Sequence, residues 1–141
     1  MNTKFDSLLK IKQQQLDKCE IDIMQNNQLI DSKNRKIDIL LQDLSEVNIP
    51  KNGGYWDFKN MQDIKKAFVN EIDKTKNEIS RLKNIGKKLQ ESYKIAFVEY
   101  EKIKYLKDNE IKKMILKIKK NELKDLDEVG IMLFKSNKEN V

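Results

Sequence analysis

The sequence predicts an all-α protein, a two-helix antiparallel coiled-coil hairpin whose second helix is longer than the first. Two apolar ladders with a spacing of seven residues flank a break that contains Pro50, Gly53 and Gly54. Such a repeat is typical of helices wound on helices. Charged residues make up 37% of the chain and hydrophobic residues 38%, which suits a thin helical rod better than a globular core. The ladders consist of Leu9, Leu16, Ile23, Ile30, Ile37 and Leu44 and, after the break, of Met61, Phe68, Thr75, Leu82, Leu89, Ala96 and Ile103.

The first helix is expected over about residues 4–47 and the linker over residues 48–56. Asn48 and Pro50 end the helix, because proline has no amide hydrogen and restricts the residue before it. A short linker forces the two helices to be antiparallel neighbours.

The second helix is expected over about residues 57–134, with Asp57 as its N-cap. Trp56, directly before this cap, is expected to pack on Met61 and to fix the direction in which the chain enters the helix. The whole chain, residues 1–141, then forms a single hairpin domain, as its length also suggests.

The two ladders also predict a register for the hairpin. Each helix carries a second seam position beside its ladder, and both seams match when Cys19 faces Gly86. A narrow seam at this point explains a glycine that otherwise costs the helix about 1 kcal/mol. Asn26 and Lys33 interrupt the seam, and their polar heads are expected to extend out of it. This register places Asn26 beside Ile79 and pairs Val47 with Phe58, Leu44 with Met61, Ile37 with Phe68, Ile23 with Leu82 and Leu16 with Leu89.

The second helix is longer than its partner can cover. In the predicted register the first helix is used up near Tyr100, so residues 101–134 form an overhang that still carries apolar side chains. An amphipathic helix without an intramolecular partner implies another protein or a second copy of the chain. The overhang is also compatible with a basic amphipathic helix that contacts an acidic partner, since it contains Lys112, Lys113, Lys117, Lys119, Lys120 and Lys124.

The composition argues against several classes of function. The chain has no histidine and one cysteine, Cys19, so neither a metal site of the usual ligand types nor an internal disulfide is expected. The Gly53-Gly54 pair lacks the residues that complete a phosphate-binding loop, and an exposed helix gives carboxylates no shared cleft for acid–base catalysis. We expect no catalytic residues, no enzyme activity, no cofactor and no metal. The N-terminus does not resemble a signal peptide and no apolar run can span a bilayer, so a cytoplasmic protein is expected.

The formal net charge of +6 raises the question of nucleic-acid binding. Arg35 and Arg81 are the only arginines, whereas recognition of bases and phosphates favours the planar guanidinium group. Lysines alternate with acidic residues along both helices, which is typical of a solvated coiled-coil face. Nucleic acid is therefore the least favoured partner.

Two segments, one at the N-terminus and one after the turn, resemble motifs of a known protein family. The opening segment Phe5-Asp-Ser-Leu8-Leu9-Lys-Ile-Lys has a phenylalanine followed by paired leucines and lysines. After the turn, Tyr55, Phe58 and Met61 are similar to an aromatic W/Y-x-x-Y-x-x-F pattern, with methionine at the third position.

Two further segments lie in the distal part of the second helix. Glu101-Lys102-Ile103 resembles an E-K-L signature, and Glu122-Leu-Lys-Asp-Leu-Asp127-Glu128 resembles an E-x-x-x-x-D-E signature. In the order and spacing of these segments and in total length, the chain resembles the FliJ family, the small helical-hairpin proteins of the bacterial flagellar export apparatus.

The resemblance implies a cytoplasmic, non-enzymatic component of the flagellar type III protein export apparatus. Proteins of this family are similar in shape to the two-helix shaft of the rotary ATP synthase gamma subunit. They associate with the hexameric export ATPase, contact the export gate membrane protein and recycle export chaperones. The chain is then expected to be a rod that binds the ATPase, promotes ring assembly and hydrolysis, and couples the ATPase to the gate and the chaperones.

The resemblance also implies roles for particular residues. The end with the chain start and the overhang would enter the ATPase ring, and the turn end would face the gate. Phe58 and Met61 also lie on the seam, where we expect core packing to be their main role. The ATPase-binding candidates are Phe5, Leu8, Ile111, Met114, Ile118, Glu122, Asp127 and Glu128, and the gate-binding candidates are Tyr55, Trp56, Phe58 and Met61.

Two other interpretations stay open. The chain is alternatively a structural dimeric coiled-coil tether, in which the overhang pairs with a second copy. It is also compatible with the equivalent stalk of a virulence type III secretion system. The leading interpretation expects a chain that is monomeric when isolated.

Overall fold

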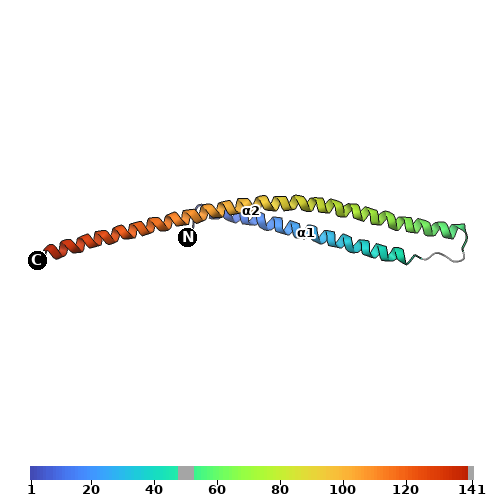
Figure 1. The fold of residues 1–141 in the computed structure, drawn as a ribbon, viewed down its shortest axis with the longest axis horizontal. Coiled ribbons are helices and arrows are strands. Elements are labelled where there is room, and N and C mark those ends of the chain that lie inside the picture. Colours follow the sequence, from blue (N-terminus) through green and yellow to red (C-terminus); the bar gives the residue numbers. More distant parts are fainter. Residues whose placement is uncertain (48–52, 140–141) are drawn as a thin grey trace. The chain divides into compact units, whose positions relative to one another are not determined.

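The structure is a computed structural model that describes residues 1–47 and 53–139. These residues form two helices and no strand: α1 spans Asp6–Ser45, 40 residues, and α2 spans Tyr55–Glu139, 85 residues (Figure 1). The all-α hairpin with a longer second helix is therefore confirmed. The predicted stop of the first helix at Asn48 and Pro50 lies outside the described residues.

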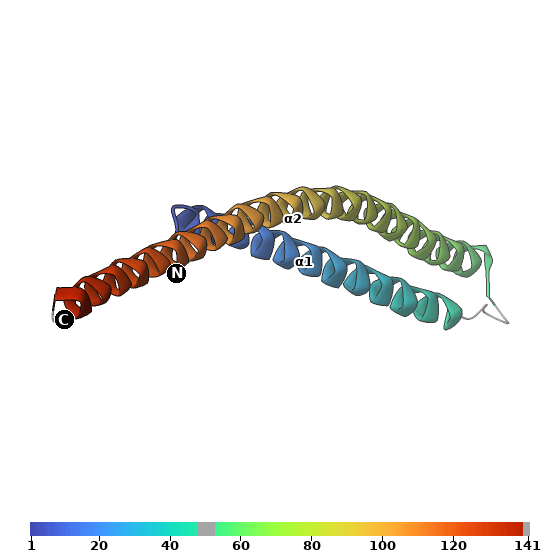
Figure 2. The ribbon, with the colours of Figure 1, turned by 60° about the vertical axis from the view of Figure 1, so that its left-hand side comes forward.

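The contacts between Cα atoms divide the chain into two compact units. One unit is Gln15–Ala96, in which α1 and α2 run antiparallel and side by side (Figures 1 and 2). The other unit combines Met1–Gln14 with Phe97–Val141. In this second unit the beginning of α1 lies along α2, and α2 then continues past the N-terminus of the chain in both views.

The core of the hairpin is a narrow seam between the two helices. Every buried residue in the described part of the chain lies at a predicted seam position, which confirms the heptad pattern. Thr75 is fully buried, and its hydroxyl donates a hydrogen bond to the carbonyl oxygen of Glu71 at 2.8 Å. The buried residues are Leu16, Asn26, Met61, Ile72, Thr75, Ile79 and Ala96.

The start of α1 is held by Thr3. Its hydroxyl oxygen accepts a hydrogen bond from the amide of Phe5 at 3.2 Å and donates one to Oδ1 of Asp6 at 3.0 Å, while its carbonyl accepts the amide of Asp6 at 3.2 Å. These bonds satisfy groups that a helix N-terminus leaves unpaired. The carboxylate of Asp6 also lies where the helix dipole favours negative charge.

The start of α2 differs from the prediction. The helix begins at Tyr55, and the carbonyl of Gly54 accepts the amide of Phe58 at 3.3 Å. Asp57 is therefore not the N-cap but a residue of the first turn, where the helix dipole still favours it. The expected packing of Trp56 on Met61 is also wrong, because Trp56 is 69% exposed while Met61 is buried. The helix starts early because glycine is itself an acceptable N-cap.

The register of the hairpin differs from the prediction by one heptad. Gly86 faces Asn26, not Cys19: a Cβ atom at position 86 would lie 3.0 Å from Nδ2 of Asn26. The same Nδ2 donates a hydrogen bond to the carbonyl oxygen of Leu82 at 3.0 Å. A seven-residue repeat makes registers one heptad apart almost equivalent for the apolar residues, whereas the buried amide distinguishes them because an unpaired buried amide is costly. The prediction placed Asn26 beside the apolar Ile79 with its polar head outside the seam, and this is wrong because Asn26 is buried.

Lysines at seam positions extend sideways to carboxylates of α2. Nζ of Lys33 lies 2.8 Å from Oε2 of Glu78, as expected for a side chain that leaves the seam. Lys12, another seam lysine, reaches Glu99 in the same way at 2.9 Å. Each carboxylate lies one residue before a seam position of α2, so both pairs fit the observed register.

In the observed register, α1 and α2 still contact each other beyond residue 101, where the overhang was expected to begin. Nζ of Lys107 lies 3.1 Å from Oδ1 of Asp6. Ile111 and Met114 are still half-buried, and the side chains of α2 are exposed from Ile115 to Lys138. The part of α2 without cover is therefore residues 115–138, called the free segment below.

Three carboxylates have their pKa lowered by lysines. The hydrogen bond from Lys36, at 2.8 Å, lowers the pKa of Glu71, and the bond from Lys33 lowers the pKa of Glu78. Lys107 does the same for Asp6. In return, Glu71 raises the pKa of Lys36. The ionised forms are thus the ones that the hairpin stabilises.

Crosslinking distinguishes the two registers. Because Asn26 faces Gly86, Ile23 is expected to lie in the layer of Leu89 rather than that of Leu82. In a chain with Cys19→Ser, we expect a short thiol crosslinker to join Ile23→Cys to Leu89→Cys within one chain and to join Ile23→Cys to Leu82→Cys much more slowly. Gel mobility and mass spectrometry of the products measure both rates. Preferential crosslinking of positions 23 and 82 would contradict the observed register.

Thermal unfolding as a function of pH tests the ion pairs. A carboxylate with a lowered folded-state pKa adds stability above its ordinary pKa of 4.5, and this stability is lost as the pH falls through the lowered value. We expect Glu71→Gln with Glu78→Gln to lower the Tm at neutral pH and to match the wild type in acid. The exposed Glu91→Gln serves as a control that leaves the Tm unchanged. A double variant whose Tm deficit persists in strong acid would show that the ion pairs are not the cause.

Candidate partner-binding surfaces

The turn end of α2 presents a cluster of exposed aromatic residues, called the tip cluster and made of Tyr55, Trp56 and Phe58. Tyr55 is 72% exposed and Trp56 69%. Their rings meet edge to face, with centroids 5.5 Å apart, and Nζ of Lys59 lies 5.4 Å from the centroid of the Trp56 ring. Large exposed aromatics of this kind often anchor protein interfaces.

The four gate-binding candidates thus fall into two groups. Met61 is buried in the seam, as its expected packing role requires. Phe58 is 47% exposed, so it packs only in part. The accessible candidates at the tip are Tyr55, Trp56 and the exposed side of Phe58.

The free segment of α2 is the second candidate surface. Its apolar residues are large, exposed and distributed along the whole segment, whereas soluble monomers rarely expose continuous apolar surface of this kind. They are Ile115, Leu116, Ile118, Leu123, Leu126, Val129, Ile131, Met132, Leu133 and Phe134.

The sequence candidates missed a groove in this segment. Leu126, Gly130 and Phe134 follow one another at intervals of one helical turn and line the groove together with Asp127, Ile131, Lys135 and Lys138. A Cβ atom at Gly130 would meet nothing within 4 Å, in contrast to Gly86 beside Asn26. The sequence signal for this groove was Gly130, because a glycine inside a helix is unfavourable unless something packs against it.

The ATPase-binding candidates lie in two places. Phe5, Ile111 and Met114 are half-buried where α1 begins, and Leu8 nearby is 39% exposed. The contact between Asp6 and Lys107 brings this part of α1 to α2. The other four candidates lie on the exposed free segment: Ile118, Glu122, Asp127 and Glu128.

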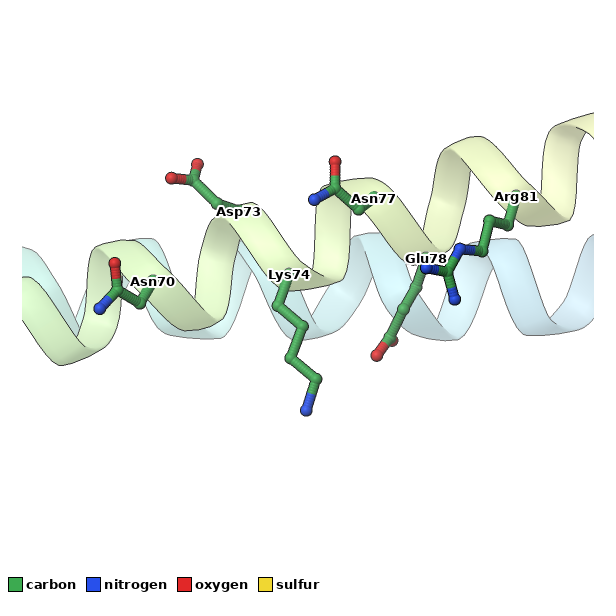
Figure 3. A pocket seen from close by; sticks show the side chains of 6 residues that line it. All are labelled: Asn70, Asp73, Lys74, Asn77, Glu78 and Arg81. Carbon is green, nitrogen blue, oxygen red and sulfur yellow. The ribbon is translucent and has the colours of Figure 1, made fainter.

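A polar hollow on α2 does not provide a catalytic site. It is lined by Asn70, Asp73, Lys74, Asn77, Glu78 and Arg81. Figure 3 shows Asp73 and Glu78 pointing to opposite sides of the helix, and Glu78 is already paired with Lys33. The two carboxylates therefore do not share a cleft in which one could act as acid and the other as base.

The described residues contain neither a cluster of metal ligands nor a membrane-spanning helix. Within residues 1–47 and 53–139, no group of three or more metal-ligating side chains is arranged to hold an ion. Neither helix, as far as it is described, contains a stretch that is long and apolar enough to cross a membrane.

Comparison with known proteins gives one match. The sequence model of the family described as the flagellar FliJ protein matches residues 1–139. No curated protein and no solved structure matches the chain significantly.

Proposed function

The chain belongs to the flagellar FliJ protein family, whose members are coiled-coil components of the flagellar export apparatus, and from this premise we propose that it is a non-enzymatic coupling rod. In this proposal the free segment of α2 binds the hexameric export ATPase, promotes assembly of its ring and stimulates hydrolysis. The tip cluster contacts the cytoplasmic part of the export gate. The rod acts at the cytoplasmic face of the export apparatus, where it also meets export chaperones.

The observation that carries the proposal is the exposed apolar surface of the free segment. Ile118 is 47% exposed, Leu126 67% and Phe134 66%, although each belongs to a residue type that proteins usually bury. The residues that hold them form regular α-helix up to the end of α2 at Glu139. Such an element suits insertion into a partner that surrounds it.

The tip cluster supports the second contact. Tyr55 and Trp56 meet edge to face, Lys59 lies over the Trp56 ring, and both aromatic side chains are largely exposed. An exposed aromatic pair on a rigid helix loses little conformational freedom on binding. Its place at the beginning of α2 leaves the free segment available for the ATPase.

A structural dimer is the alternative that the same apolar surface favours. Two copies would then bury their free segments against each other and leave no surface for a ring. Sedimentation equilibrium at micromolar concentration separates the two cases: a monomer agrees with the coupling rod, and a tight dimer held by residues 115–138 contradicts it.

A serine substitution tests the ATPase contact. We expect Ile118→Ser to weaken stimulation of the purified export ATPase at least several-fold, because an exposed side chain at a binding hot spot contributes to affinity without supporting the fold. Ile85→Ser is a matched control, since Ile85 has the same 47% exposure on the hairpin. ATP hydrolysis is measured against rod concentration. Combining Ile118→Ser with Ile111→Ser and Met114→Ser should abolish stimulation, with circular dichroism to confirm the helices. Full stimulation by the triple variant would refute the free segment as the contact surface.

Removal of the aromatic pair tests the gate contact. Tyr55→Ala with Trp56→Ala is expected to leave the Tm nearly unchanged, because both side chains are exposed, and to reduce binding to the purified cytoplasmic part of the export gate roughly tenfold or more. Tyr105→Ala, at a residue 66% exposed, is the control. Biolayer interferometry gives both affinities. Equal binding by the wild type and the tip variant would place the gate contact elsewhere.

A further inference from the structure

In α2, the heptad position directly before the second seam position faces lysines of α1. Glu71, Glu78 and Glu99 occupy this position and are separated by multiples of seven residues. Each of these glutamates forms an ion pair with α1, and such flanking pairs select the partner helix in coiled coils. The pairs are Glu71 with Lys36 at 2.8 Å, Glu78 with Lys33 at 2.8 Å and Glu99 with Lys12 at 2.9 Å.

The charge at this position changes sign toward the free segment. Two and three heptads after Glu99, the same position holds Lys113 and Lys120, and both are exposed. Together with Leu116 and Lys117 they line a shallow groove. Leu116 is 64% exposed and supplies an apolar floor between the lysines.

A helix that continued the hairpin along this groove would need acidic residues. The α1 helix of a second copy would bring lysines to the positions that face Lys113 and Lys120, and like charges at such positions are destabilising. The ion pair between Asp6 and Lys107 already has the opposite polarity, because Asp6 of α1 supplies the carboxylate and Lys107 of α2 the ammonium group. An acidic helix would extend this arrangement along α2.

We propose that the groove of Lys113, Leu116, Lys117 and Lys120 is a docking site for an acidic amphipathic helix of another protein. Apolar residues of that helix would cover Leu116, and carboxylates beside them would pair with the lysines as Glu99 pairs with Lys12. The inference concerns the chemistry of the partner helix and stands whether or not the export ATPase provides it.

A synthetic helix tests the proposal without any flagellar protein. The probe is a fluorescein-labelled amphipathic peptide with leucines on one face and glutamates beside them, and the comparison peptide carries glutamine in place of every glutamate. We expect the full-length chain to bind the glutamate peptide roughly tenfold more tightly in fluorescence anisotropy, with an affinity that falls as salt is added. Equal affinity for the two peptides would overturn the proposal.

Two pairs of lysines within residues 112–120 provide matched variants of the chain. Lys113→Glu with Lys120→Glu reverses the charge at two of the lysines that line the groove. Lys112→Glu with Lys119→Glu makes the same change of charge at the neighbouring heptad position, which is exposed along the hairpin. The groove variant is expected to lose roughly tenfold in affinity for the glutamate peptide and to gain affinity for a lysine version, while the control changes about twofold or less. Circular dichroism checks that all chains keep their helices.

The same variants separate a helix site from a general preference for anions. Anionic lipid vesicles and duplex DNA are offered in place of the peptide. Weak binding of both vesicles and DNA supports the proposal. So does vesicle or DNA binding that the two double variants reduce equally, provided that only the groove variant reduces binding of the peptide. Equal loss of peptide binding in the two variants would show diffuse attraction of an anion to a basic helix and would overturn it.

Discussion

The hydrogen bond from the buried amide of Asn26 to the carbonyl oxygen of Leu82 fixes how the two helices are aligned. Apolar seam residues recur every seven positions, so their packing alone tolerates a slip of one heptad. The amide needs an acceptor and the space that Gly86 leaves, because a Cβ at that position would lie only 3.0 Å from Nδ2. Glycine weakens the helix by about 1 kcal/mol, and at position 86 this cost secures a single register.

The register in turn decides how much of α2 is left without cover. One heptad of slip brings Asp6 to Lys107 and moves the beginning of the free segment to about Ile115. Ile111 and Met114 then belong partly to the end of the hairpin, whereas Ile118 and the residues after it are accessible. The described residues bury little beyond a narrow seam, so we propose that the chain acts through its surfaces, the tip cluster and the free segment.

Charge has a different role in the two parts of α2. Along the hairpin its glutamates neutralise the lysines of α1, and the lowered pKa values of Glu71 and Glu78 show that the ionised pairs are favoured. These pairs are only part-buried, and pairs that retain solvent contact contribute little to stability, so their main effect is to select the partner helix. Toward the free segment the same heptad position carries Lys113 and Lys120, so the helix that α2 accepts there must differ from α1 in charge.

The heptad ladders by themselves determined the helical hairpin, the seam residues and the excess length of the second helix, because apolar periodicity depends only on local spacing. The distal signatures and overall length also indicated the FliJ family, which the match over residues 1–139 shows. The sequence did not determine the register, since a repeat of seven is indifferent to a shift of seven. Nor did it reveal that Gly54 rather than Asp57 is the N-cap of α2 or that Trp56 faces solvent. These features were decided in the tertiary structure, where one buried amide must find its acceptor and the chain must turn between two helices already aligned.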